Sequence, residues 1–192
     1  MGEKFFSLAG RLRYIDRWSL MRNTRRENVA EHSYITALIA HALCVIENEL
    51  FGGKLNPDRA ASLALYHDAA EVFTGDLPTP VKYYGDDIRN AYKSIENAAE
   101  NKLLGFLPEK LRGEYKKLLS PAESVPEKKF VKYADKIAAL IKCREELSFG
   151  NREFESAEKS THAALNSANE NSVRYFMENF ADSFGLSLDD SL

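Results

Sequence analysis

Glycine and proline, the residues that most often interrupt helices, are few in this chain and confined to a small number of positions. Ten glycines and six prolines stand among 192 residues, so apolar residues can recur with the 3.6-residue period of a helix over long stretches. The sequence therefore predicts an all-α fold, a compact multi-helix bundle. A chain of this length with 44% hydrophobic residues suits one domain with a substantial core. We expect that domain over residues 1–185, followed by a flexible tail over 186–192.

Residues that favour helix ends locate the predicted helices. A short helix is expected near residues 3–10. Asn28 can cap a helix over residues 29–50, because Glu31 three residues later completes a capping box. Asn56 and Pro57 favour the start of the next helix, which is expected to run to about Thr74. Further helices are expected over about 87–105, 108–119, 126–149 and 151–180.

The charge balance and the termini limit the classes of partner. A formal net charge of −3 gives no overall positive field to hold a nucleic-acid backbone, whereas a small anion needs only a local basic cluster or a metal. The N-terminal residues lack the apolar core of a signal peptide, and no apolar run approaches the roughly 20 residues of a membrane span. We expect a cytoplasmic protein without nucleic-acid or membrane partners. The two cysteines, Cys44 and Cys143, are expected to be buried free thiols.

Four ionisable side chains fall where helical periodicity calls for apolar ones. His32 precedes Ile39 by seven residues on the inward face of its helix, and His67 lies on the stripe of the following helix, with Asp68 beside it. Asp135 flanks the apolar stripe of the helix from 126. An unpaired carboxylate there would cost several kcal/mol. A shared cation would satisfy all four groups, as an N₂O₂ ligand set.

Each of these residues alone has a commoner explanation. A lone inward histidine is more often a hydrogen-bonded core residue, and a lone helical aspartate is usually a cap or a surface charge. The combination favours one cation site, because four separate exceptions are rarer than one site. His41 lies half a turn from His32, on the opposite face, and is interpreted as structural. His162 has no acidic partner at ligand spacing and is expected at the surface.

Longer motifs around these residues resemble a known family. The motifs are Arg17-Trp18, Asn28-Val29-Ala30-Glu31-His32-Ser33, Tyr66-His67-Asp68-Ala69-Ala70-Glu71 and Thr74-Gly75-Asp76-Leu77-Pro78-Thr79-Pro80-Val81-Lys82. A bare His-Asp pair would be weak evidence, whereas these longer motifs are specific. With Asp135 they resemble the HD-domain metal-dependent phosphohydrolases, and within them the YfbR-like 5′-deoxynucleotidases, over nearly the whole chain.

The resemblance implies a fold, a reaction and a set of site residues. It implies an HD-domain bundle, usually a homodimer, that uses one divalent metal ion to convert 2′-deoxyribonucleoside 5′-monophosphates to deoxyribonucleosides and phosphate. Four protein ligands leave room for a water and a phosphate oxygen only beyond four-coordination, which favours cobalt, manganese or a similar ion over tetrahedral structural zinc without naming the metal. The family's metal ligands carry over onto His32, His67, Asp68 and Asp135. Its catalytic positions carry over onto Glu71 and Arg17, and its substrate contacts onto Arg17, Trp18, Asp68, Asp76, Leu77, Pro78, Thr79 and Asp135.

The residue types suit phosphate-ester hydrolysis. Glu71 follows His67 by four residues, which places its carboxyl group on the same side of a helix, where it can move a proton. Arg17 offers a planar fork to a phosphate, and the indole of Trp18 can pack against a sugar. The alternatives are a helix-end carboxylate for Glu71, a solvated charge for Arg17, a core aromatic for Trp18 and a plain helix terminator for residues 75–80.

Two other functions stay open at this point. The first is another HD-type nucleotide phosphohydrolase or phosphodiesterase, because one metal site can serve several phosphate esters. The second is a non-catalytic helical binding module that keeps the metal as a structural clip. The presence of Glu71 argues against the module.

Overall fold

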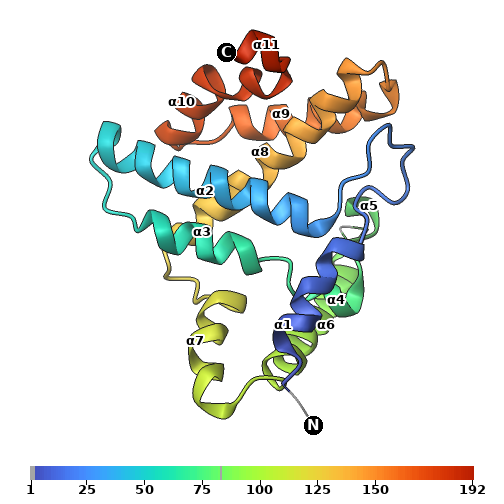
Figure 1. Cartoon of the computed structure of the whole chain (residues 1–192), viewed down its shortest axis with the longest axis vertical. Coiled ribbons are helices and arrows are strands. Elements are labelled where there is room, and N and C mark those ends of the chain that lie inside the picture. The colour runs from blue at the N-terminus through green and yellow to red at the C-terminus, as the bar shows by residue number, and fades with distance from the viewer. Residues whose placement is uncertain (1–2, 83) are drawn as a thin grey trace.

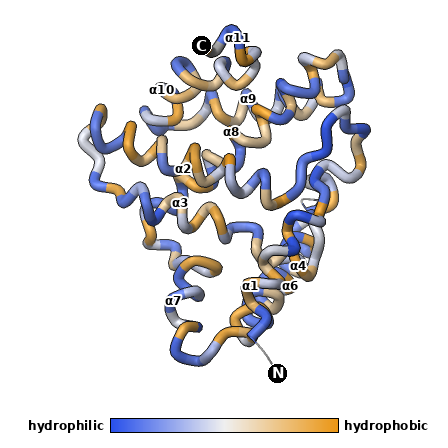
Figure 2. The backbone as a smooth tube through the Cα atoms, in the orientation of Figure 1, coloured by the Kyte–Doolittle hydropathy of each residue, from blue (hydrophilic) through white to orange (hydrophobic). Residues whose placement is uncertain are grey.

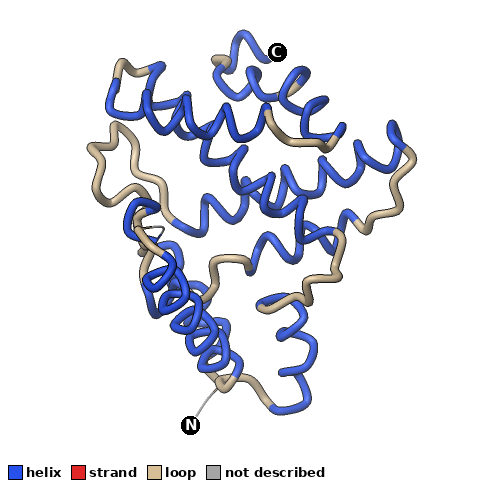
Figure 3. Tube along the Cα trace, turned by 180° about the vertical axis from the view of Figure 1, so that it is seen from behind, coloured by secondary structure: helices blue, strands red, loops and turns tan. Residues whose placement is uncertain are grey.

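Two long helices, α2 (Val29–Phe51) and α8 (Glu127–Ser148), cross at the centre of the bundle, and α3 (Pro57–Tyr66) packs against both (Figure 1). This computed structural model describes residues 3–82 and 84–192. For Thr79 and Ser191 it describes only the backbone. Within those ranges the chain is helices and loops without a strand (Figure 3). The sequence prediction of an all-α fold is confirmed.

The core has two parts. The larger lies between α2, α3, α8 and α10 (Asn171–Asn179), where Leu43, Ile137 and Val173 are fully buried. The smaller holds α1 (Phe5–Ala9) against α6 (Asp86–Leu104) and α7 (Glu109–Leu119), with Phe5 and Leu103 at its centre. Along the helices hydrophobic and hydrophilic residues alternate, as amphipathic helices require (Figure 2). The remaining elements are η1 (Gly10–Tyr14), α4 (Glu71–Thr74), α5 (Thr79–Lys82), η2 (Arg152–Phe154), α9 (Glu155–Asn166), η3 (Ala181–Gly185) and α11 (Leu188–Ser191).

Helix α2 has the ends that the sequence predicts. The Asn28 side chain accepts a hydrogen bond from the backbone N–H of Glu31, and the Glu31 carboxylate accepts one from Asn28, which completes the capping box. The helix ends at Gly52, whose φ of 73° is the left-handed conformation that glycine adopts without strain. Because the start of α2 is fixed, His32 is held one turn inside it.

The apolar run of α2 is longer than expected. By length and composition this helix could cross a membrane, with a mean hydropathy of 1.5 over an 18-residue window, which corrects the expectation that no run approaches that length. In this fold 56% of the window is buried inside the bundle. The central helix of a bundle needs the same apolar residues, because it is surrounded by other helices.

The helix expected over residues 57–74 is interrupted. Helix α3 ends at Tyr66, residues 67–70 form turns, and α4 begins at Glu71. In the turns the N–H groups of Ala69 and Glu71 bond to carbonyls three residues back, those of Tyr66 and Asp68, instead of four. In a regular helix adjacent residues point about 100° apart. The interruption turns His67 and Asp68 toward the same place.

Three other boundaries differ from the sequence predictions. The helix expected over 151–180 is divided into η2, α9 and α10, with a break at 167–170. The loop expected after Gly75 gives way to α5 at Thr79. The tail at 186–192 contains the single helical turn α11, and its flexibility stays a prediction, as does the domain boundary at 185.

The loop between η1 and α2 is fastened to α8 by a buried ion pair. Glu146 accepts hydrogen bonds from the backbone N–H groups of Thr24 and Arg25 at 2.8 and 3.1 Å, and its side chain pairs with Lys142 at 2.5 Å. Both charged side chains are buried. Burial alone would raise the pKa of Glu146, but the bonds from Lys142, Asn151 and the loop backbone hold it well below its usual range. The loop that carries Arg17 and Trp18 is therefore fixed to the core.

Removing the lysine of this pair should be costly. Lys142→Ala would leave the Glu146 carboxylate buried without its counter-charge, so we expect a loss of about 3 kcal/mol in the free energy of unfolding, measured by urea denaturation. Lys129→Ala, which breaks the partly exposed pair with Glu170, should cost less than about 1 kcal/mol. Equal losses in the two variants would contradict the role of the buried pair.

Candidate metal centre and active site

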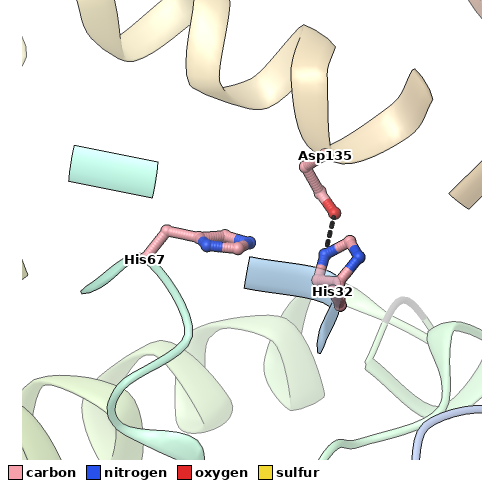
Figure 4. Close-up of side chains that lie close together, drawn as sticks. All are labelled: His32, His67 and Asp135. Atoms are coloured by element: carbon pink, nitrogen blue, oxygen red, sulfur yellow. Dashed lines mark hydrogen bonds and ion pairs between the residues drawn. The ribbon is translucent and has the colours of Figure 1, made fainter. Parts of the chain in front are cut away.

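Three side chains from different parts of the chain converge beside the core. His32 comes from the first turn of α2, His67 from the turn after α3, and Asp135 from the middle of α8 (Figure 4). One ligand atom from each lies within 4.8 Å of the other two. These are three of the four residues that the apolar stripes single out, and the structure brings them together.

The His32 ring is fully buried and bonded on one side. Its Nε2 lies 3.0 Å from Asp135 Oδ1, 3.4 Å from Thr36 Oγ1 and 3.9 Å from Asp68 Oδ2. Asp68 therefore lies near the same imidazole as Asp135, but the group of ligand atoms within 4.8 Å of one another contains only His32, His67 and Asp135, so Asp68 as the fourth ligand stays a prediction. Two carboxylates directed at one nitrogen leave an excess of negative charge that a cation can balance.

The His67 ring is oriented by the backbone. Its Nδ1 lies 2.6 Å from the carbonyl oxygen of Ala64, which can only accept, so Nδ1 carries a proton. The other nitrogen, Nε2, is buried without a hydrogen-bond partner among the described residues and lies 3.1 Å from Asp68 Oδ2, close enough for an ion pair. A histidine whose Nδ1–H is held by a carbonyl, with Nε2 directed at acidic groups, has the arrangement of a metal ligand.

Opposite charges stabilise one another in this cluster. Burial alone would lower the pKa of His67, but Asp68, Asp135 and the Ala64 carbonyl raise it to about 9. Burial would raise the pKa of both aspartates, yet the two imidazoles hold each of them below its usual range. Positive charge on the imidazoles thus stabilises the carboxylates. A divalent cation bound between the same groups would supply this positive charge in place of the imidazole protons.

Glu71 is a buried carboxyl group next to the cluster. It is the first residue of α4 and 8% exposed, and its Oε2 has no hydrogen-bond partner among the described residues. Burial, together with Asp68 and Asp76, raises the pKa of Glu71 to about 9, against the opposing effect of Arg17. The group is therefore protonated at neutral pH and able to donate a proton.

Arg17 and Trp18 lie in the fastened loop. Arg17 pairs with Glu27 at 3.1 Å, and the Trp18 indole N–H donates to the same Glu27 oxygen at 3.2 Å. Trp18 has a φ of 59°, a left-handed conformation that is unusual for a bulky residue. Its backbone N–H donates to the Asp76 carboxylate, and its ring packs 5.3 Å from that of Phe154. The Trp18 side chain is thus fixed from several sides.

Two cavities lie at this site. One, of about 550 Å³, has Arg17, Trp18 and Asp76 in its wall with Leu77 and Pro78, and α9 contributes Ala157 and Thr161. The other, of about 420 Å³, is lined by His67 and Asp135 together with Leu119 and Lys132. The first has the apolar wall and the few polar groups that suit a small molecule with a planar ring.

Comparison with known proteins decides the family. The model of the YfbR-like 5′-deoxynucleotidases matches residues 4–184. The chain belongs to the YfbR-like 5′-deoxynucleotidase family. A 5′-deoxynucleotidase of Erwinia tasmaniensis is 51% identical over 187 residues, which cover 97% of this chain and 94% of that protein. The sequence resemblance is confirmed.

Solved structures show the same fold. A crystal structure of an HD-domain phosphohydrolase from Listeria innocua has a TM-score of 0.84 and 27% identity, and the match covers 96% of this chain and 90% of that one. The HD phosphohydrolase DatZ of cyanophage S-2L, solved bound to dA and one catalytic Zn²⁺ ion, has a TM-score of 0.61 at 17% identity and covers 92% of this chain and 96% of its own. The single-domain HD bundle expected from the sequence is confirmed.

Most of the family's motif residues meet in one region of the fold. The structure places Leu77 and Pro78 in the wall of the larger cavity, whereas the side chain of Thr79 lies outside what it describes.

The two remaining histidines lie apart from the metal cluster. His41 is partly exposed on another face of α2 than His32, and lies 3.7 Å from Asp58. His162 is half-buried on α9, not at the open surface.

Sequence reasoning missed three residues that shape the site. Thr36 follows His32 by one turn and contacts its ring, a spacing that the sequence does contain. Glu27 and Glu146 fix the loop that carries Arg17 and Trp18. Their partners come from the folding of that loop, so no local pattern marks them.

The raised pKa of Glu71 predicts a stability effect in chelator-treated protein. The group's pKa is about 4.5 unfolded and about 9 folded, so the folded state keeps a proton that the unfolded state loses as the pH rises above 4.5. Its contribution to stability is complete below pH 4.5 and disappears as the pH approaches 9. Glu71→Gln lacks this titration.

We therefore expect Glu71→Gln to gain stability relative to the parent protein between pH 5 and pH 8, by at least about 1 kcal/mol. Thermal unfolding at several pH values measures the difference between the two proteins. A difference that stays constant over this range would show that Glu71 is ionised in the folded protein.

Proposed function

We propose that this chain is a 5′-deoxynucleotidase that hydrolyses 2′-deoxyribonucleoside 5′-monophosphates with one divalent ion held by His32, His67, Asp68 and Asp135. The convergence of histidine and aspartate ligand atoms within 4.8 Å, from helical segments far apart in sequence, carries the proposal. The family, whose relatives bear this activity in their names, supports it. The homodimer implied by the resemblance and the cytoplasmic location expected from the sequence belong to the same proposal.

The donor set fits a divalent ion. Nε2 of His67 is buried without a hydrogen-bond partner among the described residues and is directed at Asp68, and His32 Nε2 lies between Asp68 and Asp135. Two imidazoles and two carboxylates suit zinc, cobalt or manganese, and the cyanophage fold relative was solved with zinc. When bound, such an ion would polarise the phosphoryl group and lower the pKa of water, which would lose a proton to solvent and become a nucleophile near neutral pH.

Glu71 supplies a proton to the leaving group. Because burial raises the pKa of Glu71, its carboxyl group can hold a proton and donate it to the 5′-oxygen of the nucleoside as the P–O bond breaks. The resulting carboxylate regains its proton from solvent after the nucleoside leaves. Arg17 lies close enough to Asp68, Glu71 and Asp76 to affect the pKa of each, so its guanidinium is placed to bind the phosphate.

The larger cavity holds the nucleoside. The Trp18 indole stands in its wall, where it can border the sugar and exclude a 2′-hydroxyl, while the Asp76 carboxylate can accept a hydrogen bond from a sugar hydroxyl. Leu77 and Pro78 give the base an apolar surface.

A nucleotide panel tests this function. Purified protein with added Co²⁺ or Mn²⁺ should release phosphate from deoxynucleoside 5′-monophosphates faster than from ribonucleotides, triphosphates or cyclic nucleotides, and chelator should abolish the release. Glu71→Gln should bind the same metal but lose at least about a hundredfold in kcat, the usual scale of general acid help. Turnover near normal in that variant would remove the role of Glu71, and preference for a triphosphate or cyclic substrate would overturn the proposed reaction.

A further inference from the structure

One carboxylate oxygen holds both Arg17 and Trp18. Glu27 Oε2 accepts a hydrogen bond from Arg17 Nη1 at 3.1 Å and from Trp18 Nε1 at 3.2 Å. The side chains of Arg17 and Glu27 are only 13% and 15% exposed. A charge-assisted bond with so little solvent contact is stronger than a surface ion pair. Glu27 therefore fixes two neighbouring side chains through one atom.

The backbone connects this contact to the metal cluster. The N–H of Arg17 donates to the carbonyl oxygen of Glu27 at 2.9 Å, and Asp16 and Asn28 form an antiparallel bridge beside it. Asn28 is the N-cap of α2, whose first turn carries His32. The start of α2 thus sets the position of Glu27 relative to His32. Because Glu27 binds the side chains of Arg17 and Trp18, it fixes their positions relative to His32 as well.

Without Glu27 the side chains of Arg17 and Trp18 would be free to adopt other positions. Arg17 is near the carboxyl groups of Asp68, Glu71 and Asp76, which attract its charge in competition with a phosphate. The left-handed backbone of Trp18 is unfavourable for its side chain and is retained only because the surroundings fix it. The Asp76 bond holds only the backbone N–H of Trp18, so the indole N–H depends on Glu27.

We propose that Glu27 is a positioning residue that sets where the Arg17 guanidinium meets the phosphate and how the Trp18 indole borders the sugar. It thereby determines the affinity for the nucleotide and the preference for deoxyribose over ribose. This inference rests on the proposed nucleotidase function. Among the described residues no hydrogen bond or ion pair joins the Glu27 side chain to His32, His67, Asp68 or Asp135, so its removal affects KM and sugar preference more than kcat on a good substrate.

Glu27→Gln tests the proposal, because it keeps the shape of the side chain and removes the charge and one acceptor oxygen. Trp18 is the only tryptophan of the chain, so tryptophan fluorescence reports on its indole directly, without any need for activity. We expect a shift of the emission maximum, a rise in KM for deoxynucleoside monophosphates of roughly tenfold, the loss expected for one charged hydrogen bond, and a reduced ratio of deoxy- to ribonucleotide turnover.

Glu145→Gln is the matched control. Glu145 of α8 pairs at 3.1 Å with the exposed Arg25, which belongs to the same loop as Arg17 and Trp18. This pair involves neither Arg17 nor Trp18, so substitution of Glu145 should leave fluorescence, KM and sugar preference unchanged. If Glu27→Gln does not fold, Glu27→Asp, which keeps the charge one carbon shorter, should show the same changes at smaller size.

The outcomes separate this inference from the function on which it rests. Unchanged fluorescence and an unchanged KM in a folded Glu27 variant would overturn the positioning role. Failure of the parent protein to hydrolyse any nucleoside monophosphate, with metal present, would overturn the proposed function, even where the fluorescence shift shows that Glu27 holds Trp18. A fall in kcat alone, with KM and sugar preference kept, would also contradict the proposal.

Discussion

The structure depends on the balance of charge in a small, largely buried region where α2, α8 and the turn after α3 meet. Two imidazoles and two carboxylates meet there, with the His32 side chain fully buried and the Asp135 side chain 42% exposed, and the buried groups would be costly without partners of opposite charge. A divalent cation is the simplest species that satisfies all four, because it balances two carboxylates and accepts two nitrogen lone pairs. Two local features bring these groups together. The turn at residues 67–70 directs His67 and Asp68 to one place, and the capped start of α2 fixes His32.

Two carboxyl groups three residues apart are held in opposite protonation states. Two imidazoles and Arg17 keep the pKa of Asp68 low, whereas burial and neighbouring carboxylates raise that of Glu71 to about 9. A group that binds a cation must be ionised, and a group that protonates a leaving oxygen must carry its proton at neutral pH. The fold provides both from one short segment, since the turn directs Asp68 into the cluster and α4 keeps Glu71 beside it.

Much of this could be predicted from the sequence, because helical periodicity alone assigns each residue to a face. His32, His67 and Asp135 stood on inward faces, and the capping residues of α2 and α3 gave their start points correctly. The break after Tyr66 could not be found, because residues 66–70 contain neither glycine nor proline, and the contact between the His67 imidazole and the Ala64 carbonyl forms only in the folded chain. The break at 167–170 lacks such residues too. Glu27 and Glu146 carry no local sign of burial in the sequence, because the loop that buries them reaches α8 only in the folded chain.

Anomalous X-ray diffraction from crystals grown with Co²⁺ or Zn²⁺ tests the central claim most directly. The account predicts one strong peak bonded to nitrogens of His32 and His67 and to oxygens of Asp68 and Asp135, at about 2.0–2.2 Å from each. A metal bound elsewhere, with these four side chains still paired only to one another, would contradict it.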